Sequence, residues 1–125
     1  MDRPFGLIAE GWTIEMLRSA GVRVRRATGR EDHAEKIDFW VWSKRFQKWL
    51  PIQFTVDKEA AMSWKGSDSL KRGVVVSWLS DRKLSDWANS HSADLQKDLA
   101  GQFWNQVEGL VQGSPCLKRQ YAKAA

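Results

Sequence analysis

The sequence is poor in cysteine and histidine and has no long apolar run, and these shortages exclude several kinds of protein. Cys116 is the only cysteine in 125 residues, so an intramolecular disulfide and a zinc site built from several cysteines are both excluded. His33 and His91 have no partner at the spacing of metal ligands, and we expect both at the surface. No apolar run approaches the roughly 20 residues that span a bilayer, and the N-terminus lacks a signal-peptide pattern. We therefore expect a cytoplasmic protein with no membrane partner.

Motifs of several large enzyme classes are also missing. The chain contains no P-loop, no G-x-S-x-G, no H-E-x-x-H and no dinucleotide-binding glycine pattern. It has no internal repeat and no low-complexity segment. A function must therefore be sought outside these classes.

Basic residues and tryptophan, by contrast, are plentiful. The formal net charge of +5 permits electrostatic attraction to nucleic acid. Eight tryptophans cannot all be fully buried in a domain of this size. We expect some of them to line a groove or an interface, where an apolar ring with one N–H donor is well suited.

The hydrophobic pattern predicts one α/β domain. We expect a helix at residues 4–20, strands at 22–26, 36–42 and 49–56, a helical segment at 59–70 with an interruption near Gly66, a strand at 73–80, and one or two helices at 81–112. Residues 28–35 read as a polar loop. The helix after the third strand allows a right-handed crossover to a parallel fourth strand. The predicted domain, residues 1–113, is a mixed four-stranded sheet flanked by helices, with C-terminal helices and a basic, flexible tail at 114–125.

Side-chain alternation gathers polar residues on one face of the second and third strands. These residues are Lys36 and Asp38 in one strand, and Gln53, Thr55 and Asp57 in the other. If the two polar faces coincide, Asp38, Gln53 and Thr55 converge on one spot. Glu10 could approach this spot from the first helix.

The order of these elements and residues resembles the PD-(D/E)XK nuclease superfamily, whose members share a helix–three strands–helix–strand core. The resemblance covers about residues 5–80 and is carried by "EGWTIEMLRSAGVRV", "KIDFWV" and "PIQFT". Asp38 matches the metal-binding aspartate of the family. The segment "QFT" looks like the (D/E)-x-K segment, for which restriction-type relatives with Q-x-K are the closest pattern.

The resemblance implies a Mg²⁺-dependent endonuclease that hydrolyses phosphodiester bonds, most simply in DNA. It implies that Glu10 and Asp38 are metal-linked acids, that Gln53 supplies a neutral oxygen, and that the Phe54 carbonyl is a further ligand. In the family the metal polarises the phosphate and helps to generate hydroxide, and a lysine orients the water. A domain of this size could form a homodimer to reach both strands, as junction-cleaving relatives do.

The sequence departs from the family pattern at the residues that carry the chemistry. Thr55 stands in place of the lysine, and Gln53 stands where an acid is usual. Candidate replacements lie nearby; they are Lys36, Lys58 and Lys65 for the lysine, and Asp57 for the acid. We therefore expect a nucleic-acid-binding protein with an altered endonuclease site. The alternative is an inactive nuclease-fold protein that binds a protein partner through Trp-rich surfaces.

Structural roles stay open for the same side chains. Asp38 could bond a backbone N–H at a strand end or pair with an arginine of the first strand, and Gln53 and Thr55 could simply face solvent. Glu10 could be an ordinary acid on a helix surface. Four arginines on and after the first strand are candidates for phosphate contacts, or form a dispersed solubilising surface; they are Arg23, Arg25, Arg26 and Arg30.

Overall fold

The computed structural model describes residues 3–63 and 69–122 and confirms the predicted α/β fold. Its strands are β1 (Val24–Arg26), β2 (Phe39–Ser43), β3 (Lys48–Thr55) and β4 (Val75–Trp78). Its helices are α1 (Arg3–Ser19), α2 (Gly29–Ala34), α3 (Lys58–Met62), α5 (Asp81–Ser90), α6 (Ala93–Gly113) and α7 (Pro115–Tyr121). The sheet order is β1-β2-β3-β4. The first two pairings are antiparallel and the third is parallel, as predicted.

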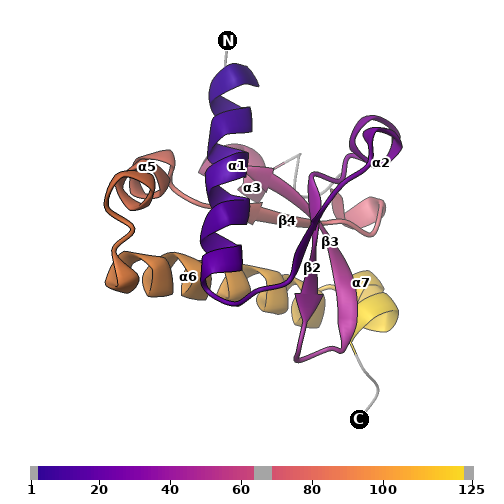
Figure 1. The fold of residues 1–125 in the computed structure, drawn as a ribbon. Coiled ribbons are helices and arrows are strands. Elements are labelled where there is room, and N and C mark those ends of the chain that lie inside the picture. The colour runs from indigo at the N-terminus through magenta and orange to yellow at the C-terminus, as the bar shows by residue number, and fades with distance from the viewer. Residues whose placement is uncertain (1–2, 64–68, 123–125) are drawn as a thin grey trace.

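The inner face of the sheet forms the core with α1, α5 and α6 (Figure 1). Along β2, Phe39 and Val41 are fully buried while Trp40 and Trp42 beside them are half-buried. Helix α6 buries one residue every four positions (Leu99, Phe103, Val107 and Val111), which is the stripe that helical periodicity places on one side. The rings of Phe39 and Phe103 stack with centroids 6.3 Å apart. The alternation of buried and half-buried residues along β2 and the regular spacing of buried residues along α6 thus decide which face of the sheet the helices cover.

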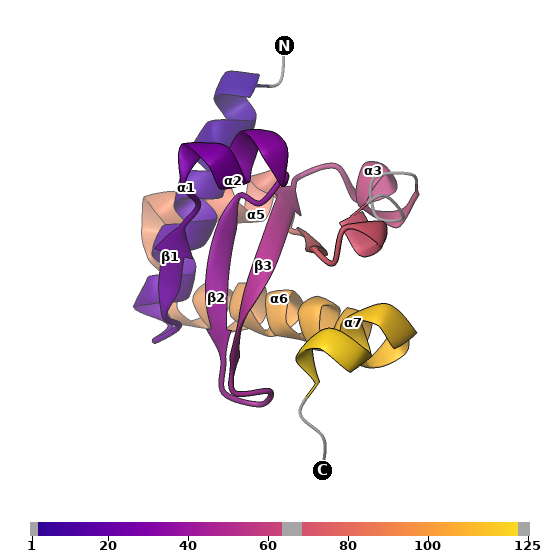
Figure 2. The same ribbon diagram turned by 90° about the vertical axis from the view of Figure 1, so that its right-hand side faces the viewer.

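The outer face of the sheet is covered unevenly. Figure 2 shows β1, β2 and β3 in front of α1, α5 and α6, with no described helix in front of β1 and β2. Helix α3 packs on the β3–β4 side of the sheet. Three tryptophans, Trp40, Trp42 and Trp49, point to this outer face and are half-buried. Among the described tryptophans only Trp87 is fully buried, so the expectation that the tryptophans are not all fully buried is confirmed.

A glutamine side chain completes the free edge of β4. The Gln106 amide oxygen accepts a hydrogen bond from the Trp78 N–H at 2.7 Å, and its amide nitrogen donates to the Trp78 carbonyl at 2.6 Å. The same oxygen accepts a hydrogen bond from the Ser77 hydroxyl at 3.3 Å. One side chain of α6 therefore forms with the backbone of Trp78 the hydrogen bonds that a neighbouring strand would form, and it fixes α6 against β4.

The expectation of a polar loop at residues 28–35 is wrong, because α2 begins at Gly29. The Thr28 hydroxyl accepts a hydrogen bond from the Glu31 N–H at 3.2 Å, and the Glu31 carboxylate accepts one from the Thr28 N–H at 2.8 Å. This reciprocal pair is a capping box, which the T-x-x-E spacing encodes. The charged composition concealed this helix start.

The expectation of a flexible tail from residue 114 is also wrong as far as the description extends. Ser114 caps α7, Leu117 is fully buried, and the Tyr121 hydroxyl donates to the Gly73 carbonyl at 2.8 Å. These contacts make α7 part of the domain. The helical segment expected at 59–70 begins as α3, which ends at Met62. The interruption expected near Gly66 lies outside the described residues, as do Trp64 and Lys65.

Over the described ranges, no helix combines the length and apolar composition required to cross a bilayer.

Candidate functional site

Two arginines and three tryptophans stack together on the outer face of β1, β2 and β3. Arg25 lies opposite Trp40 in the β1–β2 ladder, and Trp42 lies opposite Trp49 in the β2–β3 ladder. The Arg23 guanidinium carbon is 5.6 Å from the Trp42 ring centroid and 5.3 Å from that of Trp49. The Arg25 guanidinium carbon is 5.0 Å from the Trp40 centroid and 5.9 Å from that of Trp49. These are cation–π distances, and we call the five residues the Arg–Trp face.

Neighbouring contacts hold the rings of this face in place. The Trp42 and Trp49 rings meet edge to face, with centroids 5.7 Å apart and planes at 69°, a favourable aromatic arrangement. The Trp40 indole N–H donates to the Glu31 carboxylate at 3.2 Å, which ties the ring to α2. Both arginines remain exposed while the three tryptophans are half-buried. These contacts hold the three indole rings in place on the sheet.

A pocket of about 470 Å³ continues from the Arg–Trp face. It shares Arg23 and Trp42 with that face and adds cations from the β2–β3 turn and two residues of α6; the added residues include Lys44, Arg45, Trp104 and Glu108. Arg45 pairs with Glu108 at 3.2 Å. Indole rings and cations thus extend along one continuous surface.

A second candidate site lies where α1 meets the start of β2. Burial first, then the nearby charges of Asp38 and Asp32, raise the pKa of Glu10 to about 7, and Arg26 acts in the opposite direction. The charge of Asp38 thus acts on the partly buried Glu10 carboxylate. The charges of Asp32 and Arg26 also act on Glu10, which the sequence did not indicate.

Asp38 also has a structural role. Its N–H donates to the Ile52 carbonyl at 2.8 Å, and its carboxylate accepts a hydrogen bond from the Phe54 N–H at 2.7 Å. The prediction that Asp38 bonds a backbone N–H at a strand end is therefore confirmed. The same bond fixes the carboxylate at the end of the β2–β3 ladder, within electrostatic reach of Glu10.

The polar residues at the end of β3 are engaged by local structure. The Gln53 side-chain oxygen accepts a hydrogen bond from the hydroxyl of Ser69, which is fully buried. The Thr55 hydroxyl accepts one from the Asp57 N–H at 3.0 Å. The Asp57 carboxylate accepts the Ala60 N–H at 3.1 Å and so caps α3, as its residue type favours. Asp57, the candidate replacement for the acid missing at Gln53, thus has a helix-capping role.

Not all of the cations that could replace the missing lysine lie close to Glu10 and Asp38. The Lys58 ammonium lies 5.4 Å from the Trp78 ring centroid, near β4. Lys36 is exposed, with a φ of 59° two residues before Asp38. The cation that acts on the Glu10 carboxylate is Arg26, whose register partner is Phe39 on the inner face. Arg30 is an exposed residue of α2, outside the Arg–Trp face.

Glu10 and Asp38 offer two hard oxygen ligands that suit Mg²⁺. A divalent cation between them would offset the repulsion and desolvation that raise the Glu10 pKa. In residues 3–63 and 69–122, no group of three or more His, Cys, Asp or Glu side chains could hold a metal. A Mg²⁺ ion would therefore depend on these two carboxylates together with neutral oxygens.

The raised pKa of Glu10 makes stability depend on pH. Because the folded state binds this proton up to about pH 7 and the unfolded chain only to about 4.5, wild-type stability falls as pH rises through this interval. We expect Glu10→Gln to be more stable than wild type by about 1–2 kcal/mol at pH 8, after discounting for partial exposure, with the gain vanishing near pH 4. Urea unfolding at several pH values measures this. A gain that does not grow with pH contradicts the assignment.

Comparison of the chain with protein-family models, with curated proteins and with solved structures finds no match.

Proposed function

We propose that this domain binds single-stranded nucleic acid across the Arg–Trp face. The observation that supports this proposal is the stacking of Arg23 and Arg25 on three ordered tryptophans, on a part of the sheet that no described helix covers (Figure 2). Every base has a π face that can stack on an indole ring, whatever the sequence. Guanidinium groups bind phosphate through several N–H donors in a fixed geometry.

The surrounding positive charge favours a nucleic-acid strand that lies along the surface of the sheet. Lys44 extends the basic surface from Arg23 into the adjoining pocket, where Arg45 is paired with Glu108, and the whole chain carries a net charge of +5. Unpaired bases are needed for this mode, because bases within a duplex are stacked on each other and do not expose their faces. The proposal therefore concerns single strands and unpaired regions.

The affinity for a labelled single-stranded oligonucleotide, followed by fluorescence anisotropy at several salt concentrations, tests the proposal. We expect log K to fall linearly with log salt concentration. Arg23→Gln/Arg25→Gln should reduce the slope by about 1.4, or roughly 0.7 for each phosphate that the variant no longer neutralises. Arg82→Gln/Lys97→Gln removes the same charge from exposed positions on α5 and α6 and should leave the slope unchanged.

Two outcomes of this titration would count against the proposal. Equal effects of the two double variants would contradict it, because the charge would then act from anywhere on the surface. Absence of salt-dependent affinity would favour a protein partner at the Trp-rich surface.

A second candidate function is Mg²⁺-dependent hydrolysis of the bound strand. The observation that favours it is the partly buried Glu10 carboxylate, whose pKa is raised to about 7 by burial first and then by the charge of Asp38. These carboxylates would hold the ion, which when bound polarises a phosphate. Arg26 would supply the positive charge that a lysine supplies in the nuclease superfamily that the sequence resembles. Cleavage of the oligonucleotide that requires Mg²⁺ or Mn²⁺ and is lost in Glu10→Gln supports this function, whereas binding without cleavage in either metal contradicts it.

A further inference from the structure

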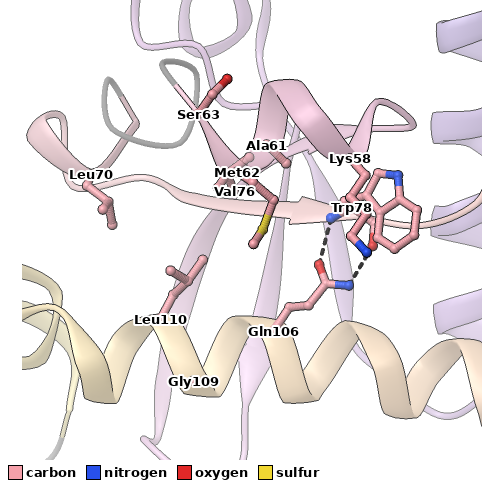
Figure 3. Close-up of a pocket in the computed structure, with 10 residues that line it drawn as sticks. All are labelled: Lys58, Ala61, Met62, Ser63, Leu70, Val76, Trp78, Gln106, Gly109 and Leu110. Carbon is pink, nitrogen blue, oxygen red and sulfur yellow. Dashed lines mark hydrogen bonds between the residues drawn. The ribbon is translucent and has the colours of Figure 1, made fainter.

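A separate pocket of about 540 Å³ lies between α3, β4 and α6 (Figure 3). Its walls are mainly apolar side chains from these elements and from the segment before β4; they are Ala61, Met62, Leu70, Val76, Trp78 and Leu110. Met62 is 79% exposed although it lines the pocket. The size and apolar lining are those of small-molecule sites. The pocket shares no lining residue with the Arg–Trp face.

The polar groups at this pocket are nearly all engaged within the protein. The Gln106 amide uses its oxygen and its nitrogen on the backbone of Trp78, as the dashed lines in Figure 3 show. The Trp78 indole N–H donates to the Val56 carbonyl at 2.9 Å, and the Ser63 hydroxyl donates to a carbonyl of α3 at 3.5 Å. Lys58 is the one cation among the described lining residues, and they include no acid.

We propose that this pocket binds an amphipathic carboxylate, such as a medium-chain fatty acid. The apolar chain would occupy the space between Met62, Val76 and Leu110, where its burial is favourable. The carboxylate would lie at Lys58, whose ammonium already lies at one wall, 5.4 Å from the Trp78 ring centroid. Among the described lining residues, this one cation beside mainly apolar side chains is complementary to a ligand with one negative head and an apolar body.

Gly109 provides a way to close the pocket without disturbing the fold. It lines the pocket from α6, and a Cβ at this position would meet no heavy atom within 4 Å. A larger side chain there extends into open space and removes a helix-interior glycine, which favours the helix. Gly101 lies on the same helix with equally open space but does not line the pocket. Gly101→Phe is therefore a matched control for Gly109→Phe.

Isothermal titration with decanoate, below its micelle concentration, and with 1-decanol tests the proposal. We expect saturable decanoate binding to wild type, a loss of about tenfold or more in Gly109→Phe, and a change below about twofold in Gly101→Phe. Lys58→Met should weaken decanoate binding about tenfold, because it removes a charge-assisted hydrogen bond. The same change should alter decanol binding by less than about twofold.

Two results would overturn the proposal. Absence of saturable decanoate binding to wild type, or equal binding by the two phenylalanine variants, excludes the pocket as the site. Decanoate binding that Lys58→Met leaves unchanged excludes recognition of the carboxylate. Circular dichroism establishes that each variant is folded, and Gly109→Leu replaces Gly109→Phe if the larger ring is not tolerated.

Discussion

Replacing Trp42 and Trp49 together with alanine should lower the affinity for a single-stranded oligonucleotide about 100-fold. Each indole that stacks on a base contributes about 1–3 kcal/mol to binding when measured by alanine substitution, and about 2.7 kcal/mol corresponds to about 100-fold. The two rings are cross-strand partners held edge to face, so they lie side by side on the outer face of the sheet. Fluorescence anisotropy at fixed salt measures the loss.

Trp42→Phe/Trp49→Phe is the matched control for this prediction. Phenylalanine keeps an aromatic face at both positions, so we expect affinity within about fivefold of wild type if stacking is the interaction. Because both tryptophans are half-buried, the measurements belong at a temperature where circular dichroism shows all three proteins folded. A folded alanine variant with wild-type affinity excludes the Arg–Trp face as the binding surface.

Replacing Gln106 with leucine should lower the free energy of unfolding by about 2–4 kcal/mol. The change leaves the N–H and carbonyl of Trp78 without the partners that the Gln106 amide supplies at 2.7 and 2.6 Å, and each unsatisfied group costs about 1–3 kcal/mol when shielded from water. The side-chain volume is nearly conserved, so altered packing contributes little. Urea unfolding monitored by tryptophan fluorescence gives the value.

Gln102→Leu, one turn earlier on α6, separates the role of the Gln106 amide from the general effect of leucine. The Gln102 amide donates to Asp98 at 3.1 Å at an exposed position, so we expect a change below about 0.5 kcal/mol. Equal destabilisation by the two substitutions would show that Gln106 does not hold the edge of β4.

Most of the fold could be predicted because local patterns and tertiary structure agree. The alternation through Phe39, Trp40, Val41 and Trp42 separates an inner face from an outer face, and the same rule applies along β3. The segment between β3 and β4 was expected to form a crossover, and the parallel pairing follows. These features depend on residues close to each other in the sequence.

Two helices that were not predicted, α2 and α7, depend on contacts that the amino-acid composition does not indicate. Residues 28–35 look like a solvated loop until the reciprocal bonds between Thr28 and Glu31 are recognised as a helix start. Helix α7 is ordered by burial of Leu117 and by the Tyr121–Gly73 hydrogen bond. That bond spans 48 positions of the chain, and no local pattern indicates it.

The residue types of the candidate site could be predicted from the sequence, but the contacts between those residues could not. Excess tryptophan indicated a surface role, and Arg23 and Arg25 were candidates for phosphate contacts. Their stacking follows only from the β1–β2–β3 register, which a strand as short as β1 does not determine from sequence. The effect of the Arg26 charge on the pKa of Glu10 likewise depends on the packing of α1 against the sheet.

The measurement that tests the central claim most directly is the salt dependence of oligonucleotide affinity for wild type, Arg23→Gln/Arg25→Gln and Trp42→Ala/Trp49→Ala. If the Arg–Trp face binds the strand, the tryptophan variant gives a line parallel to wild type but about 100-fold lower, because stacking involves no phosphate charge. The arginine variant gives a shallower line, by about 1.4 in slope. Three coincident lines would contradict the account.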